Sequence, residues 1–166
     1  MAPQRPLPAP AVTGDADVAS VFNTLRRLVH SMHAASRDSE RQLGVTGAQL
    51  FVLTQLRATP SLSINALAER TLTHQSTVSV VVRRLVRRKL VKKVRAADDA
   101  RRVELTLTPA GTALLRRAPE VMQVRLMRAI GTLALGDRAV MARGLAHLLR
   151  EMGGTTDSPV PMFFES

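Results

Sequence analysis

The stretch RRLVRRKLVKKVRAADDARR, from Arg83 to Arg102, holds most of the positive charge of this chain. Ten of its residues are Lys or Arg and two are Asp, so it carries 10 − 2 = +8 of a formal net charge of +11. Its apolar residues follow helical and then strand spacing, as at Leu85, Leu90 and Val94, which indicates a segment anchored to a core. A solvated basic arm, the alternative, needs no such residues. Positive charge held in fixed geometry predicts a polyanionic partner, because phosphate neutralisation releases counterions.

Composition and length narrow both the partner and the class of protein. Nucleic acid is the first candidate partner, and an anionic membrane surface is the second. The chain has 166 residues, about one domain by the usual range of roughly 100 to 200, and 45% of them are hydrophobic. No apolar run approaches the roughly 18 residues that span a bilayer, and residues 1–17 lack the apolar region of a signal peptide. We therefore expect a cytoplasmic protein with no membrane partner.

The sequence lacks the motifs of the common enzyme classes. It has no cysteine, which excludes a disulfide framework, a thiolate metal site and a catalytic thiol. It has no glycine-rich phosphate loop, no nucleophile elbow and no metal-binding His-Glu pattern. We therefore expect neither an enzyme nor a cofactor.

The N-terminal part divides into a leader and a long helix. Four prolines within residues 1–14 predict a disordered, extended leader. From Asp15 onward, apolar residues recur at steps of three and four, which predicts one long helix. Its apolar stripe consists of Val18, Val21, Phe22, Leu25, Leu28, Val29 and Met32. Such a stripe has to be covered by something else.

Two shorter helices are predicted next from their first residues. Thr46 and Gln49 have capping-box spacing, so a helix should start near Gly47 and end near Arg57. Ser63 can cap a third helix over residues 64–71, and Leu62 before it suits a short strand.

The segment from Gln75 to Arg88 is open to two interpretations. Its run of valines suits a strand, but the apolar spacing continues at a helical period as far as Leu85. Ser and Arg residues gather on the opposite side, which favours a helix. After Leu90 the period falls to two, and this predicts a β-hairpin whose turn is formed by residues 96–100.

Two long helices and a tail are expected after the hairpin. Pro109 suits the first position of a helix, since it lacks only an amide that would be unpaired there. The apolar spacing predicts one helix from Ala110 to about Ile130 and a second from about Gly136 to Met152. Residues 153–166 are expected to form a tail that contains Phe163 and Phe164. These two rings either pack over an interface or belong to an unstructured end.

The order of the elements predicts the fold class. Two short helices joined by a tight turn, the second presenting Ser, Thr and Arg outward, form a helix-turn-helix, and a hairpin directly behind it forms a wing. We therefore predict a mainly α-helical fold with a small β-hairpin wing. A single winged helix does not need the first helix and the two last helices of this chain. Their presence therefore indicates that these helices pair with something.

These motifs resemble those of a known family. The pattern LAERT....STVS..V.RL....LV, followed by DDARRVELTLTPAG, resembles the MarR family of winged helix-turn-helix transcription regulators. The family's wing motif is matched by Asp99 and Arg101 and, after five residues, by Leu107-Thr108. The resemblance covers about residues 15–152. It implies a DNA-binding winged helix-turn-helix at 44–108 and N- and C-terminal dimerisation helices at 15–43 and 109–152.

The resemblance also implies which residues contact double-stranded DNA. The helix from Gln75 to Arg88 would enter the major groove, and Arg101 would enter the minor groove with Asp99 orienting it. Arginine reads guanine in the major groove and favours narrow minor grooves, whereas hydroxyls and amides mostly contact phosphates. The expected DNA-binding residues are Thr73, Gln75, Ser76, Thr77, Ser79, Arg83, Arg84, Arg87, Asp99, Arg101 and Arg102.

Three positions depart from the family pattern. Val80 stands where arginine is frequent, and it could instead touch a thymine methyl group. Leu72 and Lys89 each replace a frequent glycine, so these two residues are expected at positive φ. The departures bear on the target sequence and leave the fold unchanged.

The resemblance further implies a regulator that responds to a ligand. Members form homodimers, which place two recognition helices about 34 Å apart on a pseudo-palindrome, and most are repressors. Many respond to a small aromatic or anionic effector in a crevice beside the dimerisation helices. The candidate ligand-binding residues for that crevice are Arg27, His30, His33, Gln49 and Phe51.

Two other functions remain open at this point. His30 and His33 share a helix face and could bind a metal ion, although two His without further ligands form a weak zinc signal, and we assign no metal site. An architectural protein that binds DNA with little sequence preference would share the basic charge and the winged fold.

Overall fold

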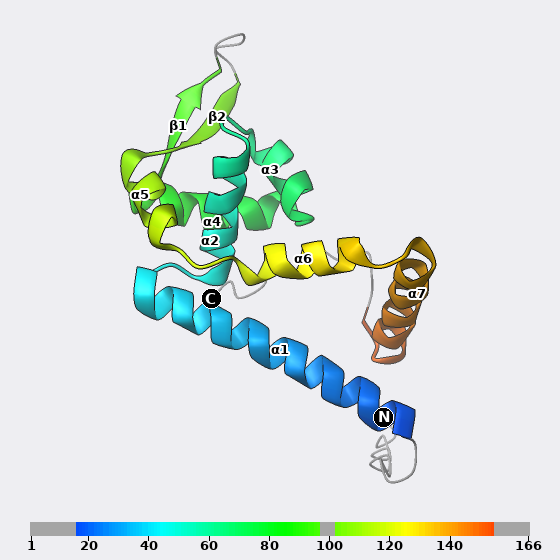
Figure 1. Cartoon of the computed structure of the whole chain (residues 1–166). Helices are drawn as coiled ribbons and strands as arrows, with labels where there is room; N and C mark the ends of the chain where they lie inside the picture. The colour runs from blue at the N-terminus through cyan, green and yellow to red at the C-terminus, as the bar shows by residue number, and fades with distance from the viewer. Residues whose placement is uncertain (1–15, 97–101, 155–166) are drawn as a thin grey trace, which may run out of the picture.

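The computed structural model describes residues 16–96 and 102–154, and Figure 1 shows the chain. These two ranges contain seven α-helices and one antiparallel sheet of two strands. In chain order the elements are α1 (Ala16–Leu43), α2 (Gly47–Ala58), α3 (Ile64–Thr71), α4 (Gln75–Arg87), β1 (Val91–Arg95), β2 (Val103–Leu107), α5 (Pro109–Arg117), α6 (Met122–Thr132) and α7 (Leu135–Glu151). A mainly helical fold with a β-hairpin is thus confirmed.

Helix α2 is the centre of a lobe formed by α2 to α5 and the hairpin. It contacts α3, α4, α5 and β2 as well as α1 and α6. Its side chains Leu50, Leu53 and Leu56 are completely or almost completely buried, and full burial of each such side chain stabilises a fold by about 1.5 to 3 kcal/mol. The core of this lobe holds α3, α4 and the hairpin in place.

The predicted helix starts are confirmed by their capping hydrogen bonds. The backbone amide of Gln49 donates to Thr46 Oγ1 over 3.3 Å, and the amide of Thr46 donates to Gln49 Oε1 over 3.4 Å. Ser63 caps α3, and Thr108 caps α5 with Pro109 at the start of the helix. These caps satisfy amides that would otherwise lack partners at the helix ends.

Helical spacing, not valine content, decides the structure of the segment after Thr73. Residues 75–87 form helix α4, whose apolar side is buried against the core through Val78, Val81, Val82 and Leu85. The hairpin behind it pairs Val91 with Leu107 and Arg95 with Val103. Leu62 bridges to Leu105 beside it, as its short-strand prediction required.

The two non-glycine residues expected at positive φ are found there. Leu72 has φ 51° at the end of α3, and Lys89 has φ 57° at the end of α4. Left-handed backbone without glycine costs roughly 1 to 2 kcal/mol per residue. The turns on both sides of α4 therefore carry local strain.

The prediction of one helix from Ala110 to Ile130 was wrong. Helix α5 ends at Arg117 and α6 begins at Met122, with Ala118 in an extended conformation at ψ 137°. Pro119 explains the break, because proline has no amide to donate and disfavours helical backbone in the residue before it. The extended linker 118–121 turns α6 toward α1, and the two helices are in contact.

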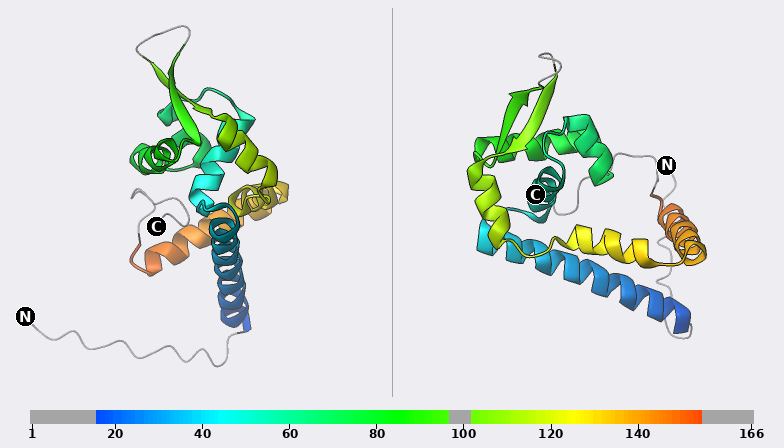
Figure 2. Two further views of the ribbon diagram at one scale, coloured as in Figure 1. Left: turned by 90° about the vertical axis from the view of Figure 1, so that its left-hand side faces the viewer. Right: turned by 45° about the horizontal axis from the view of Figure 1, so that its top comes forward.

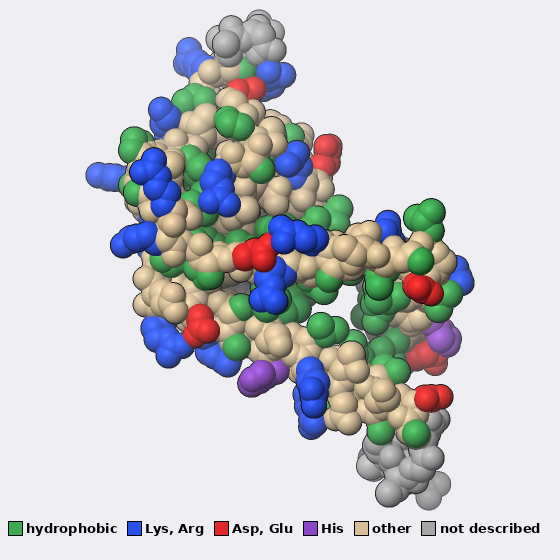
Figure 3. All heavy atoms as spheres, in the orientation of Figure 1, with side chains coloured by type: hydrophobic (Ala, Val, Ile, Leu, Met, Phe, Trp, Pro, Cys, Tyr) green, Lys and Arg blue, Asp and Glu red, His purple; other side chains and the backbone are tan. Residues whose placement is uncertain are grey.

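Helices α1, α6 and α7 extend away from the lobe, as the two views of Figure 2 show. None of the residues of α7 is buried. The apolar stripe of α1 is also exposed over its first half, with 61% of Phe22 accessible. Figure 3 shows hydrophobic side chains gathered along α6 and α7 and around the opening toward α1. No helix in the described part of the chain is long and apolar enough to cross a membrane.

Candidate nucleic-acid interface

Helices α3 and α4 and the turn between them form the helix-turn-helix. Helix α3 ends at Thr71 and α4 begins at Gln75, so the turn has three residues. Helix α4 packs on α3, α2 and β1. These contacts fix its polar side relative to the wing.

The polar residues predicted near the start of α4 are accessible to different degrees. Gln75 and Ser76 are exposed, whereas Thr73, Thr77 and Ser79 are half-buried. The hydroxyl of Thr73 donates to the carbonyl of Thr71 over 2.9 Å, and that of Ser79 donates to the carbonyl of Gln75 over 2.9 Å. A hydroxyl has one hydrogen, so these two can only accept further hydrogen bonds.

The N-cap of α4, directly before Gln75, is a residue that sequence reasoning missed. His74 is the N-cap of α4, and its Nδ1 accepts a hydrogen bond from the backbone amide of Ser76 over 3.5 Å. Its side chain is exposed. The position directly before the predicted helix was the available signal, but histidine is not among the preferred N-cap residues.

Arginines continue the polar side of α4 toward its end. Arg83 and Arg87 are exposed and lie four residues apart, which places them on one face of the helix. Arg84 is half-buried. Arg88, at the C-cap, instead donates to the carbonyl oxygen of Gly44 and to Gln49 Oε1. Arg88 therefore joins the recognition helix to the start of α2.

The wing adds three further cations beside α4. Lys92, Lys93 and Arg95 on β1 are exposed. Arg102 is exposed too, but its Nη2 lies 3.2 Å from Glu104 Oε1 on β2, so part of its charge is compensated. The predicted wing-tip residues Asp99 and Arg101 lie outside the described residues.

A second feature is a cavity of about 210 Å³ where α1, α2 and α6 meet. Its lining includes Met32, Ser36, Gly47, Leu50, Val121 and Gln123. The amide of Gly47 donates to Ser36 Oγ over 3.3 Å. Gln123 is only 5% exposed, and its Nε2 has no hydrogen-bond partner in the part of the chain that the structure describes. A buried donor without a partner is costly.

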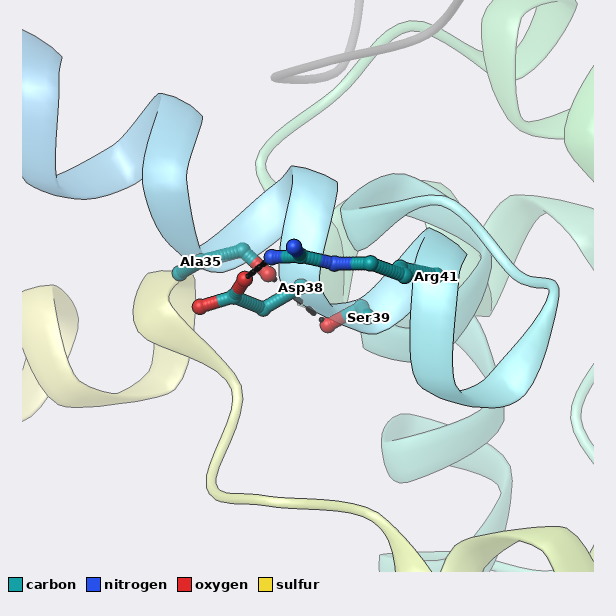
Figure 4. A network of polar contacts seen from close by, with 4 residues as sticks. All are labelled: Ala35, Asp38, Ser39 and Arg41. Atoms are coloured by element: carbon teal, nitrogen blue, oxygen red, sulfur yellow. Dashed lines mark hydrogen bonds and ion pairs between the residues drawn. The ribbon is translucent and has the colours of Figure 1, made fainter.

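Side chains of α1 line the other side of this cavity. Ala35, Asp38 and Ser39 belong to it, and Figure 4 shows how they are held. Ser39 Oγ donates to the carbonyl of Ala35 over 3.0 Å, and Asp38 pairs with Arg41. Asp38 and Ser39 are thus already engaged within the helix, unlike Gln123.

The five residues predicted to bind a ligand do not come together at this cavity. Phe51 is 2% exposed and belongs to the hydrophobic core, and Gln49 is buried with its side chain in the capping box. Arg27, His30 and His33 are exposed on α1, and none of the five lines the cavity. Within residues 16–96 and 102–154, no three His, Cys, Asp or Glu residues are grouped to hold a metal ion.

Comparisons with known proteins agree with this geometry. The model of the MarR family matches residues 43–102. The chain is 30% identical over 128 residues to the transcriptional repressor MdtR of Bacillus subtilis, covering 77% of this chain and 73% of the relative.

Two solved structures extend the likeness beyond the matched segment. The regulator BpsR of Bordetella bronchiseptica is 30% identical, with a TM-score of 0.52 over 81% of this chain and 98% of BpsR. The YusO protein of Bacillus subtilis is 26% identical, with a TM-score of 0.52 over 82% of this chain and 99% of YusO. The chain therefore belongs to the MarR family of winged helix-turn-helix proteins, which regulate transcription by binding DNA and are not enzymes.

Proposed function

We propose that the protein is a cytoplasmic repressor that binds a pseudo-palindromic operator as a homodimer and is modulated by a small ligand. Repression is supported by the relative MdtR, which is a repressor. The observation that carries the proposal is that two kinds of surface occur in one molecule. Helix α4 and strand β1 present a basic, polar face, and α1 and α7 present apolar faces that no other described residues cover.

A second copy of the chain is the partner that suits the open apolar faces. Phe22 on α1 and Val140 on α7 are both 61% exposed, and other apolar residues beside them are exposed as well. A contiguous apolar surface of this kind marks an interaction site. Pairing through 15–43 and 109–152 would place two recognition helices about one turn of DNA apart, roughly 34 Å.

The DNA contacts are proposed from the accessible residues of α4 and the wing. Arg83 and Arg87 are placed to reach base edges or phosphates, and Gln75 is the exposed amide nearest the start of the helix. Thr73 and Ser79 would act as acceptors, toward amino groups of bases, because their hydrogens are already donated. Asp99 and Arg101 keep their proposed role at the wing tip.

A small ligand with a carbonyl or carboxylate group would complete the cavity at α1, α2 and α6. Its acceptor oxygen would take the hydrogen bond that Gln123 Nε2 lacks. The volume of about 210 Å³ is below the roughly 300 to 1,000 Å³ of pockets for drug-sized ligands, so a single ring is the expected size. DNA binding by BpsR is regulated by 6-hydroxynicotinic acid, a one-ring carboxylic acid.

Competition binding tests the DNA part of the proposal. The protein is used to select sequences from a random DNA library, and its affinity for the selected DNA is compared with that for random DNA at physiological salt. A preference of about a thousandfold or more is expected for a sequence-specific regulator. Equal binding to both would favour an architectural protein.

The ligand part is tested with 6-hydroxynicotinic acid as a probe. We expect it to raise the melting temperature of the wild-type protein and to change its affinity for the selected DNA. Gln123→Leu should abolish both effects, whereas Gln55→Leu, a half-buried glutamine outside the cavity, should leave them unchanged. A response of Gln123→Leu equal to that of the wild type would contradict the assigned cavity.

A further inference from the structure

The N-cap of the recognition helix holds a histidine whose two ring nitrogens are in different situations. Nδ1 of His74 lies 3.5 Å from the backbone nitrogen of Ser76 and 2.9 Å from Ser76 Oγ. Nε2 has no hydrogen bond within the described residues, and the side chain is exposed. The cap therefore uses one nitrogen and leaves the other for an external partner.

When the capping bond is made, the neutral ring of His74 carries its proton on Nε2. A backbone amide can only donate, so Nδ1 must be the acceptor of the hydrogen bond from Ser76. In a neutral imidazole one nitrogen accepts and the other carries the hydrogen. Nε2 of His74 is consequently an N–H donor, held at the first turn of α4 by the same bond that caps the helix.

The exposed amide of Gln75 also offers hydrogen-bond donors near this end of α4, but two of the hydroxyls there do not. The hydroxyls of Thr73 and Ser79 donate to backbone carbonyls. The hydroxyl of Ser76 lies 2.9 Å from His74 Nδ1. The hydroxyls of Thr73 and Ser79 are thus left as acceptors, which cannot pair with acceptor atoms of bases or with phosphate oxygens.

We propose that His74 is a specificity-determining residue, whose Nε2–H donates to an acceptor on a base edge in the major groove. The acceptors available there are guanine O6 and N7, adenine N7 and thymine O4. The N-terminal residues of a recognition helix are those that contact base edges in helix-turn-helix complexes. The assignment rests on the proposed sequence-specific binding. In each half-site, the Nε2–H of His74 would then recognise one base pair by its acceptor.

The experiment separates the cap from the donor. In His74→Ser the serine can cap the helix through its hydroxyl, but the outward ring donor is lost. We expect its melting temperature to stay near that of the wild type and its affinity for the selected DNA to fall about fivefold, the effect of one lost hydrogen bond. Affinity for random DNA should change less than twofold, and selection with the variant should lose the preference at one base pair per half-site.

His74→Thr, a second capping variant, repeats the test if the serine variant is unstable. Unchanged selection with His74→Ser and His74→Thr would overturn the assignment, as would equal losses on selected and random DNA, which indicate a phosphate contact. If the wild-type protein itself selects no sequence, the proposed function fails first and the role of His74 with it.

Discussion

At the scale of single residues, Leu72 shows what the turn of the helix-turn-helix costs. It has φ 51° and ψ 40° at the C-cap of α3, while 80% of its side chain is exposed. Left-handed backbone costs roughly 1 to 2 kcal/mol for a non-glycine residue, and glycine would remove this cost. Glycine also loses more conformational freedom on folding than leucine does, which offsets the gain by about 0.5 to 1 kcal/mol. Leu72→Gly should therefore raise the free energy of unfolding by about 0.5 to 1 kcal/mol.

Chemical denaturation at fixed protein concentration measures this change. Arg70→Gly provides the control, because Arg70 is exposed in the last turn of the same helix. Glycine at a helical position should lower stability by about 1 kcal/mol. A loss of stability in Leu72→Gly as large as that of the control would show that the leucine side chain makes contacts worth more than the strain.

At the scale of elements, the start of α5 is packed directly on the turn between α4 and β1. The amide of Thr108 donates to the carbonyl of Leu90 over 3.1 Å, and its hydroxyl donates to the carbonyl of Lys89 over 2.7 Å. A Cβ atom added at Gly111 would lie 2.2 Å from the carbonyl oxygen of Leu90. Backbone rather than a flexible side chain blocks the space, so the two elements would have to separate.

Gly111→Ala should lower the free energy of unfolding by about 1 to 3 kcal/mol, the usual cost of overpacking. Gly144→Ala is the matched control, since an added Cβ on α7 meets nothing within 4 Å in this chain. It should instead raise stability by about 0.5 to 1 kcal/mol, because alanine favours a helix over glycine. The two variants are compared by chemical denaturation, and a Gly111→Ala protein as stable as the wild type would refute this close contact.

Elements whose signals are local could be predicted from the sequence. The capping pair Thr46 and Gln49 and the cap Ser63 each depend on a few neighbouring residues. The positive φ of Leu72 follows instead from the family resemblance, in which glycine is frequent at this position. The apolar spacing is continuous on both sides of Pro119, so spacing alone predicts no helix break there. Proline inside an apolar pattern should have ended the predicted helix.

The candidate site could be predicted only where it lies on one element. The polar face of α4 follows from its own spacing, and Arg83 and Arg87 are exposed as expected. The cavity is formed by α1, α2 and α6, which are distant in sequence, so no local pattern marks Gln123. The family resemblance implies Gln49 and Phe51 as residues that line the ligand crevice, but Gln49 caps its helix and Phe51 fills the core.

At the scale of the whole molecule, two surfaces of opposite character lie on different elements. The lobe of α2 to α5 and the hairpin buries nearly all of the core and carries the basic residues of α4 and β1. Helices α1, α6 and α7 bury little and expose apolar side chains. Affinity for a pseudo-palindrome depends on both surfaces, because two half-sites are bound together only if the apolar faces pair.

Phe22→Asp tests this dependence at the apolar face. A carboxylate within an apolar interface is costly to bury, so we expect the wild-type protein to sediment at twice 18.1 kDa and the variant at 18.1 kDa. Its affinity for the selected DNA should fall by about a hundredfold or more, since the second half-site no longer binds intramolecularly.

Leu72→Asp is the control, because Leu72 lies on the DNA-binding lobe and is more exposed than Phe22. This variant should remain a dimer. A monomeric wild-type protein, or a Phe22→Asp variant that dimerises and binds like the wild type, would mean that α1 does not form the interface and that the open apolar faces serve another partner.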